Sequence, residues 1–106
     1  MPERRRVVVT GIGAVSPNGV GREVFWKACR EGVSGVGRIT RFDASGSPVQ
    51  IAGEVKGFRE EDFVSTKDSP HVSRAAPMAI AAAQEALEDA RIPWQEMPRE
   101  ELRKVG

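Results

Sequence analysis

The first regular element that the pattern of apolar positions predicts is a strand near the start of the chain. Residues 5–16 (RRVVVTGIGAVS) contain three successive valines after two arginines, and two glycines before a Ser-Pro pair. An unbroken run of β-branched residues is typical of a strand that is buried on both faces, as in sheets covered by helices. The sequence Pro-Asn-Gly at residues 17–19 predicts a turn directly after this strand.

A short helix and a half-exposed strand are predicted next. Residues 22–31 (REVFWKACRE) place apolar or small side chains together on one helical face: Val24, Phe25, Ala28 and Cys29. Gly32 is expected to end this helix, because glycine commonly follows the last helical residue. Residues 33–47 predict a connection that contains glycine and serine. Residues 49–55 (VQIAGEV) alternate apolar and polar positions, as a half-exposed strand does.

The strongest helical pattern lies in residues 75–91. Before it, we expect a helical turn over residues 60–64 and a polar surface loop over residues 65–73. Ser73 is expected to cap the helix. Its expected buried stripe is Ala79, Ile80, Ala83, Leu87 and Ala90, and its polar faces carry Gln84, Glu85, Glu88, Asp89 and Arg91. Small residues on such a stripe imply close packing against another backbone. Residues 102–106 (LRKVG) predict the start of another strand.

These elements predict an α/β fold that is incomplete within the 106 residues of the chain. The pattern accounts for two complete strands and two complete helices. A two-stranded unit whose strands are buried on both faces is a poor independent domain. We therefore expect residues 1–106 to be the opening segment of a larger, truncated α/β domain.

Composition narrows the functional classes. The chain has 16 Lys and Arg against 15 Asp and Glu, a formal net charge of +1, which argues against a dedicated nucleic-acid-binding domain. Its longest near-apolar runs, residues 7–15 and 75–83, are about half of the ~20 residues that a membrane-spanning helix needs. A single cysteine excludes an internal disulfide and fits a reducing compartment. We therefore expect a cytoplasmic protein with no membrane or nucleic-acid partner.

The glycines at residues 11 and 13 suggest a dinucleotide-binding fingerprint, which the neighbouring residues do not complete. Ser16 stands where the third glycine or alanine of that fingerprint belongs, and Pro17 then delays the next helix. A helix N-terminus would therefore not meet a pyrophosphate. We expect no nucleotide cofactor, and we expect Gly11 and Gly13 to permit tight backbone packing at the end of a strand.

The remaining candidates for chemistry also have simpler structural explanations. Cys29 lies late in a predicted helix and on its apolar face, where the helix dipole disfavours a thiolate, so we expect a packed and inert thiol. His71 lies in the polar loop without a second ligand at a metal-binding spacing, which predicts a solvated side chain and no metal site. The acidic cluster at residues 60–62 and the charged cluster at residues 99–101 are expected to face solvent.

Taken in order, several segments resemble the N-terminus of the β-ketoacyl-acyl-carrier-protein synthases, and in particular the type II elongating synthases of bacterial fatty-acid synthesis. The matching segments are residues 5–17 (RRVVVTGIGAVSP), 25–26 (FW), 32–36 (GVSGV), 39–43 (ITRFD), 51–55 (IAGEV), 79–90 (AIAAAQEALEDA) and 105–106 (VG). Each motif is weak alone. The ordered set covers nearly the whole chain with correct spacing and is specific.

This resemblance implies a thiolase-like fold, of which residues 1–106 would form the first strands and helices of the N-terminal half. It also implies the decarboxylative Claisen condensation of an acyl thioester with malonyl-acyl-carrier protein. In that reaction a cysteine thiolate carries the acyl group and two histidines stabilise the developing charge. In the family these residues lie downstream of position 106. The resemblance therefore assigns no catalytic, cofactor-binding or metal-binding residue here, and the isolated chain is expected to be inactive.

The resemblance also implies one binding element. In elongating synthases the loop that matches residues 65–74 carries basic residues that meet the acidic acyl carrier protein. Lys67 matches such a position, and Arg74 lies near it and could compensate for a basic pair that Pro70 and His71 replace. The expected partners are thus an acyl carrier protein and, for a full-length protein, a second copy in a homodimer.

Departures from the family pattern leave other interpretations open. Arg91 follows Ala90 where the family ends this helix with Ala-Gly, and Pro77 stands where a polar helix residue is common. Such changes suit a polyketide ketosynthase or a non-catalytic partner subunit that resembles a chain-length factor. A third interpretation is an unrelated small binding module, which would behave as a stable and cooperative monomer.

Overall fold

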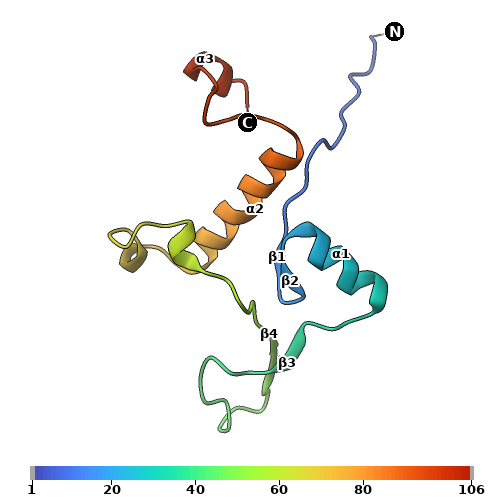
Figure 1. Cartoon of the computed structure of the whole chain (residues 1–106). Coiled ribbons are helices and arrows are strands. Elements are labelled where there is room, and N and C mark those ends of the chain that lie inside the picture. Colours follow the sequence, from blue (N-terminus) through green and yellow to red (C-terminus); the bar gives the residue numbers. More distant parts are fainter. Residues whose placement is uncertain (1, 106) are drawn as a thin grey trace.

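The computed structural model describes residues 2–105 and combines two small antiparallel sheets with three α-helices (Figure 1). The elements in chain order are β1 (Val15–Ser16), β2 (Gly19–Val20), α1 (Arg22–Glu31), β3 (Val36–Arg38), β4 (Ile51–Gly53), the 3-10 turns η1 (Glu60–Asp62) and η2 (Ser69–His71), α2 (Ala75–Asp89) and α3 (Arg99–Leu102). β1 pairs with β2, and β3 pairs with β4. This mixture of strands and helices confirms the α/β class.

The first turn and α1 form as local sequence rules predict, whereas β2, which completes a hairpin, is not predicted from the sequence. β1 and β2 pair around the predicted turn at residues 17–19, and the Gly21 amide donates a hydrogen bond to the Ala14 carbonyl at 2.8 Å. α1 spans the residues predicted from its amphipathic pattern. Gly32 ends it in the left-handed conformation, with φ of 68°, which glycine adopts at low cost.

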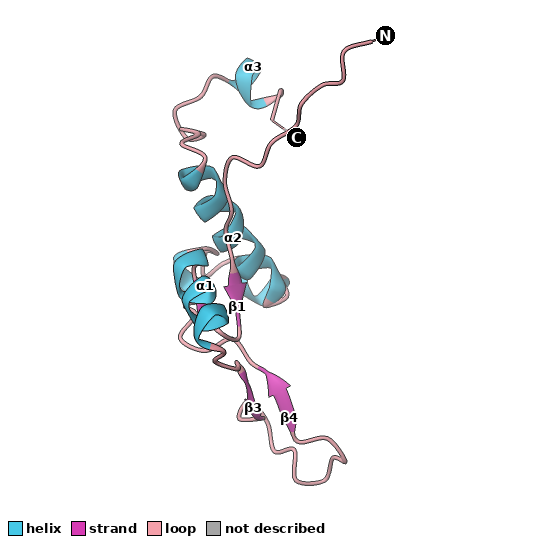
Figure 2. Cartoon of the chain, turned by 90° about the vertical axis from the view of Figure 1, so that its right-hand side faces the viewer, coloured by secondary structure: helices cyan, strands magenta, loops and turns pink. Residues whose placement is uncertain are grey.

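β3 and β4 form a separate hairpin that extends away from the helices (Figure 2). β4 lies inside the strand predicted over residues 49–55, whereas β3 falls in residues 33–47, where the sequence predicts only a connection. The carboxylate of Glu54 ties the two arms together, because it accepts hydrogen bonds from the Thr40 hydroxyl (2.8 Å) and the Arg41 amide (3.0 Å). Backbone pairing therefore creates a strand that the glycine-rich sequence does not suggest.

Gly11 and Gly13 bring the extended N-terminal segment against the backbone of α2. A Cβ atom on Gly13 would lie 2.7 Å from the Ala82 carbonyl carbon and 3.0 Å from the Ala86 nitrogen, and one on Gly11 would lie 2.8 Å from the Ala90 nitrogen. Only glycine fits at this separation. The close packing predicted from small residues is confirmed. The predicted stripe is wrong at three positions, which are exposed because the helix presents a different face: Ala79, Ile80 and Ala83.

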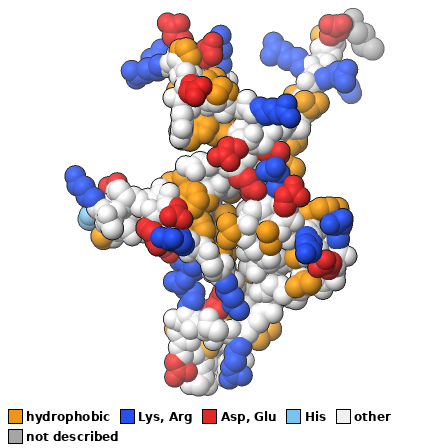
Figure 3. Space-filling view, in the orientation of Figure 1, with side chains coloured by type: hydrophobic (Ala, Val, Ile, Leu, Met, Phe, Trp, Pro, Cys, Tyr) orange, Lys and Arg blue, Asp and Glu red, His pale blue; other side chains and the backbone are white. Residues whose placement is uncertain are grey.

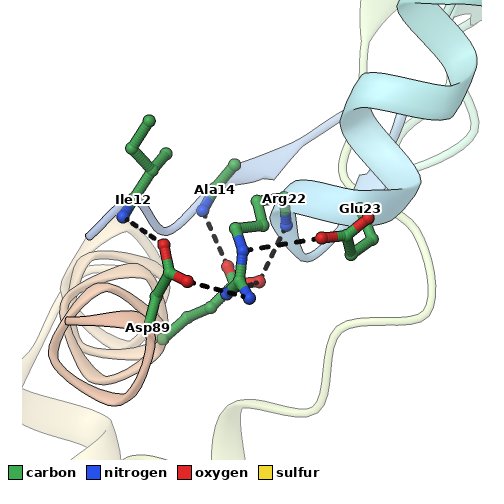
Figure 4. A network of polar contacts seen from close by, with 6 residues as sticks. Ile12, Ala14, Arg22, Glu23 and Asp89 are labelled. Carbon is green, nitrogen blue, oxygen red and sulfur yellow. Dashed lines mark hydrogen bonds and ion pairs between the residues drawn. The ribbon is translucent and has the colours of Figure 1, made fainter. Parts of the chain in front are cut away.

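Two carboxylates of α2 complete this contact (Figure 4). Glu85 accepts hydrogen bonds from the amides of Ala14 (2.9 Å) and Arg22 (2.8 Å), and Asp89 accepts one from the amide of Ile12 (3.0 Å). Ile12 and Ala14 are alternate residues of an extended segment, so their amides lie about 6.8 Å apart. Glu85 and Asp89 are four positions apart on a helix, a rise of about 6 Å. The spacing of the two carboxylates is therefore close to the spacing of the two amides. The Arg22 guanidinium pairs with Glu85 at 3.5 Å and Asp89 at 3.2 Å. Residues assigned from sequence to a polar face thus fasten the N-terminal segment.

The valine run at residues 7–9 is extended but has no neighbouring strand. Val7, Val8 and Val9 are 93%, 70% and 80% exposed. Within the described part of the chain, residues 3–10 take part in no backbone hydrogen bond. The prediction of a strand buried on both faces is therefore wrong for this chain by itself, because nothing within residues 2–105 pairs with the run or covers it.

The surface of the chain is larger than that of a compact protein of equal mass. The accessible area is 8882 Å², whereas compact monomers of 11.5 kDa expose about 5,800 Å². The radius of gyration is 18.0 Å, against about 13 Å for a compact domain of this length. Within residues 2–105 the buried apolar side chains are all small: Ala28, Ala44, Ala81 and Pro77. Hydrophobic side chains instead lie open to solvent (Figure 3).

The last predicted elements differ from the structure at two points. Leu102 ends α3, and residues 103–105 form no strand, while Gly106 lies outside the described residues. Arg74 rather than Ser73 occupies the N-cap position of α2, and the Ser73 carbonyl accepts the Ala76 amide at 3.1 Å. The helical turn over residues 60–64 and the polar loop over residues 65–73 are confirmed. No helix of residues 2–105 has the length and apolar character needed to cross a membrane.

Candidate functional site

The polar loop over residues 65–74 lies between η1 and α2, and Lys67 is exposed near its middle. A tight turn holds the backbone around this lysine. The Asp68 amide donates to the Ser65 carbonyl at 3.0 Å, the Ser69 amide donates to the same carbonyl at 2.9 Å, and the Ser65 hydroxyl donates to the Asp68 carboxylate at 2.6 Å. The loop therefore presents the Lys67 ammonium to solvent from a locally ordered turn.

Arg74 is positioned differently from Lys67. Its Nε donates to the Glu60 carboxylate at 2.8 Å, and its Nη2 donates to the Val55 carbonyl at 3.2 Å. The side chain is 27% exposed. The structure thus brings Arg74 to η1 and to Val55, two residues after β4, and within residues 2–105 no hydrogen bond or ion pair joins it to Lys67. Sequence reasoning missed Glu60, because no pattern links an acidic turn to an arginine fourteen positions later.

Charges of both signs occur in equal number in this part of the chain. Residues 56–74 contain four basic side chains (Lys56, Arg59, Lys67 and Arg74) and four acidic ones (Glu60, Glu61, Asp62 and Asp68). Two of the basic groups are paired, because Arg59 contacts its acidic neighbours and Arg74 contacts Glu60. A hydrogen bond from its own backbone, together with Arg59, holds the pKa of Glu61 below its ordinary value. Lys56 and Lys67 make no ion pair within residues 2–105.

The thiol and the imidazole of the described residues lie in different elements. Cys29 belongs to α1 and is exposed, so the expected packing of its side chain is wrong. His71 lies in η2 and is exposed, in agreement with a solvated side chain. No hydrogen bond within residues 2–105 gives either group the base or orienting partner that nucleophilic catalysis needs. A grouping of three or more metal-ligand side chains is also absent from these residues.

A hollow of about 350 Å³ lies between α1 and the N-terminal segment. Its wall is largely apolar and includes Ile12, Phe25 and Trp26, which are 57%, 39% and 59% exposed. The charged rim is formed by Arg22, Glu23 and Asp89, and Arg22 pairs with Asp89 at 3.2 Å and with Glu23 at 3.7 Å. The hollow therefore offers mainly a surface for apolar packing, and both of its carboxylates are paired with Arg22.

Comparisons with known proteins identify this arrangement. The family model described as "Beta-ketoacyl synthase, N-terminal domain" matches residues 4–106. The chain is 39% identical over 100 residues to 3-oxoacyl-[acyl-carrier-protein] synthase 2 of Synechocystis sp., an alignment that covers 94% of this chain and 24% of the relative. It is 37% identical over 91 residues to the granaticin polyketide putative beta-ketoacyl synthase 2 of Streptomyces violaceoruber, covering 86% of this chain and 22% of that protein.

A solved structure shares the fold. The ishigamide ketosynthase/chain length factor superimposes with a TM-score of 0.76 at 38% sequence identity, covering 90% of this chain and 24% of that chain. The fold is therefore thiolase-like, as the sequence resemblance implies. The chain spans about a quarter of the length of these relatives. From the match over nearly all of its residues, the chain belongs to the β-ketoacyl synthase family.

Proposed function

We propose that residues 1–106 are the first part of a β-ketoacyl-acyl-carrier-protein synthase domain. Such an acyltransferase condenses an acyl thioester with malonyl-acyl-carrier protein, with loss of carbon dioxide, in fatty-acid biosynthesis. The match of residues 4–106 to the N-terminal domain of the family carries this proposal. The relative in Synechocystis, whose name specifies 3-oxoacyl-[acyl-carrier-protein] synthesis, supports the substrate class.

The exposed surface of the chain supports a role as part of a larger domain. The chain exposes about 3,000 Å² more than a compact monomer of its mass. This excess is larger than the total area buried in a standard protein interface, about 1,600 Å². In this proposal the remaining synthase polypeptide pairs with residues 7–9 and covers the aromatic wall of α1.

The chemistry of the proposed reaction comes from that remaining polypeptide. Condensation needs a cysteine thiolate with a depressed pKa and preorganised donors for the thioester oxygen. Cys29 is exposed on α1 without a partner base among the described residues, and His71 lies on a separate turn. We therefore assign no catalytic residue to this chain and expect it to be inactive in isolation.

The loop over residues 65–74 is our candidate for contact with the acyl carrier protein. Lys67 supports this assignment, because its ammonium group is exposed and has no ion-pair partner among residues 2–105. Arg74 belongs to the same loop, but its guanidinium donates to Glu60 and to the Val55 carbonyl, so the direct contact is assigned to Lys67. A single exposed charge pair contributes about 0.2–1 kcal/mol, so Lys67 alone gives a weak and salt-sensitive contact. The full protein is proposed to act in the cytoplasm as a homodimer.

The alternative is a polyketide ketosynthase or a non-catalytic partner that resembles a chain-length factor. The relative named for granaticin polyketide synthesis and the ketosynthase/chain length factor structure favour it. A catalytic synthase of either pathway carries a nucleophilic cysteine, which in the family lies downstream of position 106, whereas a non-catalytic partner lacks it. The coding sequence of the natural gene beyond codon 106 discriminates between them.

A chimeric enzyme tests the proposal directly. The segment of the Synechocystis synthase that aligns with this chain is replaced by residues 1–106, giving a protein that we call the chimeric synthase. We expect it to condense acyl and malonyl carrier thioesters, while the isolated 106-residue chain gives no product above a blank. A soluble, folded chimeric synthase without condensing activity would contradict the proposed function.

Two matched variants of the chimeric synthase test the carrier contact. Lys67→Ala should raise the KM for malonyl-carrier protein about two- to fivefold, as expected for one exposed charge pair, and leave kcat unchanged. Lys27→Ala removes another exposed lysine, on α1, and should change neither constant. The effect of Lys67→Ala should vanish at high salt. Equal KM values for both variants would remove Lys67 from the contact.

A further inference from the structure

Residues 56–72, which we call the excursion, form a long loop between β4 and α2. Its base is the place where its two ends, near Val55 and Arg74, come together, and the Arg74 side chain makes the hydrogen bonds there. The other hydrogen bonds of this excursion are internal: the Phe63 and Val64 amides donate to the Glu60 carbonyl at 3.0 Å each, and the His71 amide donates to the Asp68 carbonyl at 2.9 Å. Within residues 2–105, the hydrogen bond that joins the excursion to the rest of the chain comes from Arg74.

Arg74 holds both ends of the excursion at once. The residue directly precedes α2, and its guanidinium reaches back to the Val55 carbonyl, the last residue before the excursion begins. The same guanidinium holds the Glu60 carboxylate through Nε at 2.8 Å. A planar guanidinium presents several donors in a fixed geometry, so one side chain can bridge a backbone carbonyl and a carboxylate. The ends of the excursion are thereby closed.

We infer that Arg74 is a positioning residue that closes the base of residues 56–72 and so fixes the turn that carries Lys67. The effect on carrier binding rests on the proposed function, whereas the closure itself does not. The Nε and Nη2 atoms of Arg74 already donate to Glu60 and to the Val55 carbonyl, and the side chain is only 27% exposed. Arg74 therefore acts through the loop and does not itself bind the carrier.

An aromatic contact makes this inference testable without loss of the fold. The rings of Phe58 and Phe63 stack with centroids 5.4 Å apart and an interplanar angle of 8°. Phe63 also lines a hollow against Ala81 and Glu85 of α2. The stack lies within the excursion, and Phe63 faces α2 across the hollow, so loss of Arg74 should loosen the excursion locally while α2 stays folded.

Hydrogen exchange in the chimeric synthase tests the closure. Arg74→Ala should speed exchange of the Phe63 and Val64 amides by a factor of about 5–30, the range expected for losing 1–2 kcal/mol of local stability. Exchange of the Ala90 amide, bonded to the Ala86 carbonyl of α2, should not change. Arg74→Lys keeps the charge but loses the two-point geometry, and should give an intermediate rate. Unchanged exchange in Arg74→Ala would overturn the inference.

A double-mutant cycle distinguishes positioning from direct contact. If Arg74 acts through the turn that carries Lys67, then Arg74→Ala raises the KM for malonyl-carrier protein with kcat unchanged, and has no further effect on KM in a Lys67→Ala background. Additive effects on KM would show that Arg74 meets the carrier itself and would overturn the inference. If exchange at Phe63 responds but Lys67→Ala has no effect on KM, the closure stands and the proposed carrier contact fails.

Discussion

Substitution of Gly13 by alanine probes the contact that holds the N-terminal segment on α2. The added Cβ would lie 2.7 Å from the Ala82 carbonyl carbon and 3.0 Å from the Ala86 nitrogen. Ordinary carbon contacts begin near 3.5 Å, so the strand and the helix must separate by about 1 Å. Both neighbours are backbone atoms of α2 and have no rotamer to change. Overpacking of this kind costs about 1–3 kcal/mol.

The separation also stretches the hydrogen bonds on either side of Gly13. The amides of Ile12 and Ala14 donate to Asp89 at 3.0 Å and Glu85 at 2.9 Å. Hydrogen exchange of these two amides in the chimeric synthase therefore measures the effect. At about 2 kcal/mol we expect exchange about 30-fold faster than in the parent protein.

Gly37→Ala is the matched control, because nothing lies within 4 Å of a Cβ built at Gly37 and its φ is not in the left-handed range. This substitution should leave exchange at Ile12 and Ala14 unchanged. The reasoning fails if Gly13→Ala exchanges as slowly as the parent, since the segment would then not lie against the helix backbone.

Three further results are expected. Glu85→Gln should lower the free energy of unfolding of the chimeric synthase in urea by about 1.5–3 kcal/mol, because a charged acceptor of two amides is lost. Glu88→Gln changes an exposed residue and should leave the unfolding free energy unchanged. Equal urea midpoints for the two variants would contradict the role of Glu85 in this contact. The Thr40 hydroxyl keeps the pKa of Glu54 below the ordinary value of 4.5, so its carboxylate stabilises the β3–β4 hairpin above that pH and this contribution is lost as the pH falls through the lowered pKa. The Thr40 amide shift should therefore titrate with a midpoint below 4.5, and a higher midpoint would refute the assignment. Val8→Asp should leave the circular dichroism of the isolated chain unchanged but prevent soluble expression of the chimeric synthase; normal expression would mean that Val8 stays exposed there.

Local sequence rules predict the elements whose determinants are close together in the chain. The amphipathic face and Gly32 fix α1, and alternation of apolar and polar residues locates β4. The small residues of α2 correctly indicate contact with another backbone, but hydrophobicity alone misplaces three of the five predicted positions, whereas Ala90 does lie at the contact. Gly11 and Gly13 of the N-terminal segment determine which alanines of α2 this segment contacts. The two glycines are more than sixty residues away from these alanines in the sequence.

The rest of the fold depends on contacts that a single sequence does not reveal. β3 exists because its backbone pairs with β4, and its glycines give no strand signal. The sequence suggests Arg74 as a second basic residue of the carrier contact, but it does not reveal that Arg74 pairs with Glu60 at 2.8 Å. The valines at residues 7–9 carry the correct signal for a buried strand, but burial requires neighbours that residues 2–105 do not include. The family resemblance supplies the functional class that these local patterns lack.

Amide exchange at residues 7–9 tests the central claim that this segment is an inner strand of a larger synthase domain. These residues make no backbone hydrogen bond within the described part of the chain, so their amides in the isolated chain should exchange at the rate of an unstructured peptide. In the chimeric synthase we expect the same three amides to be among the slowest to exchange. Equally fast exchange in both proteins would contradict the account.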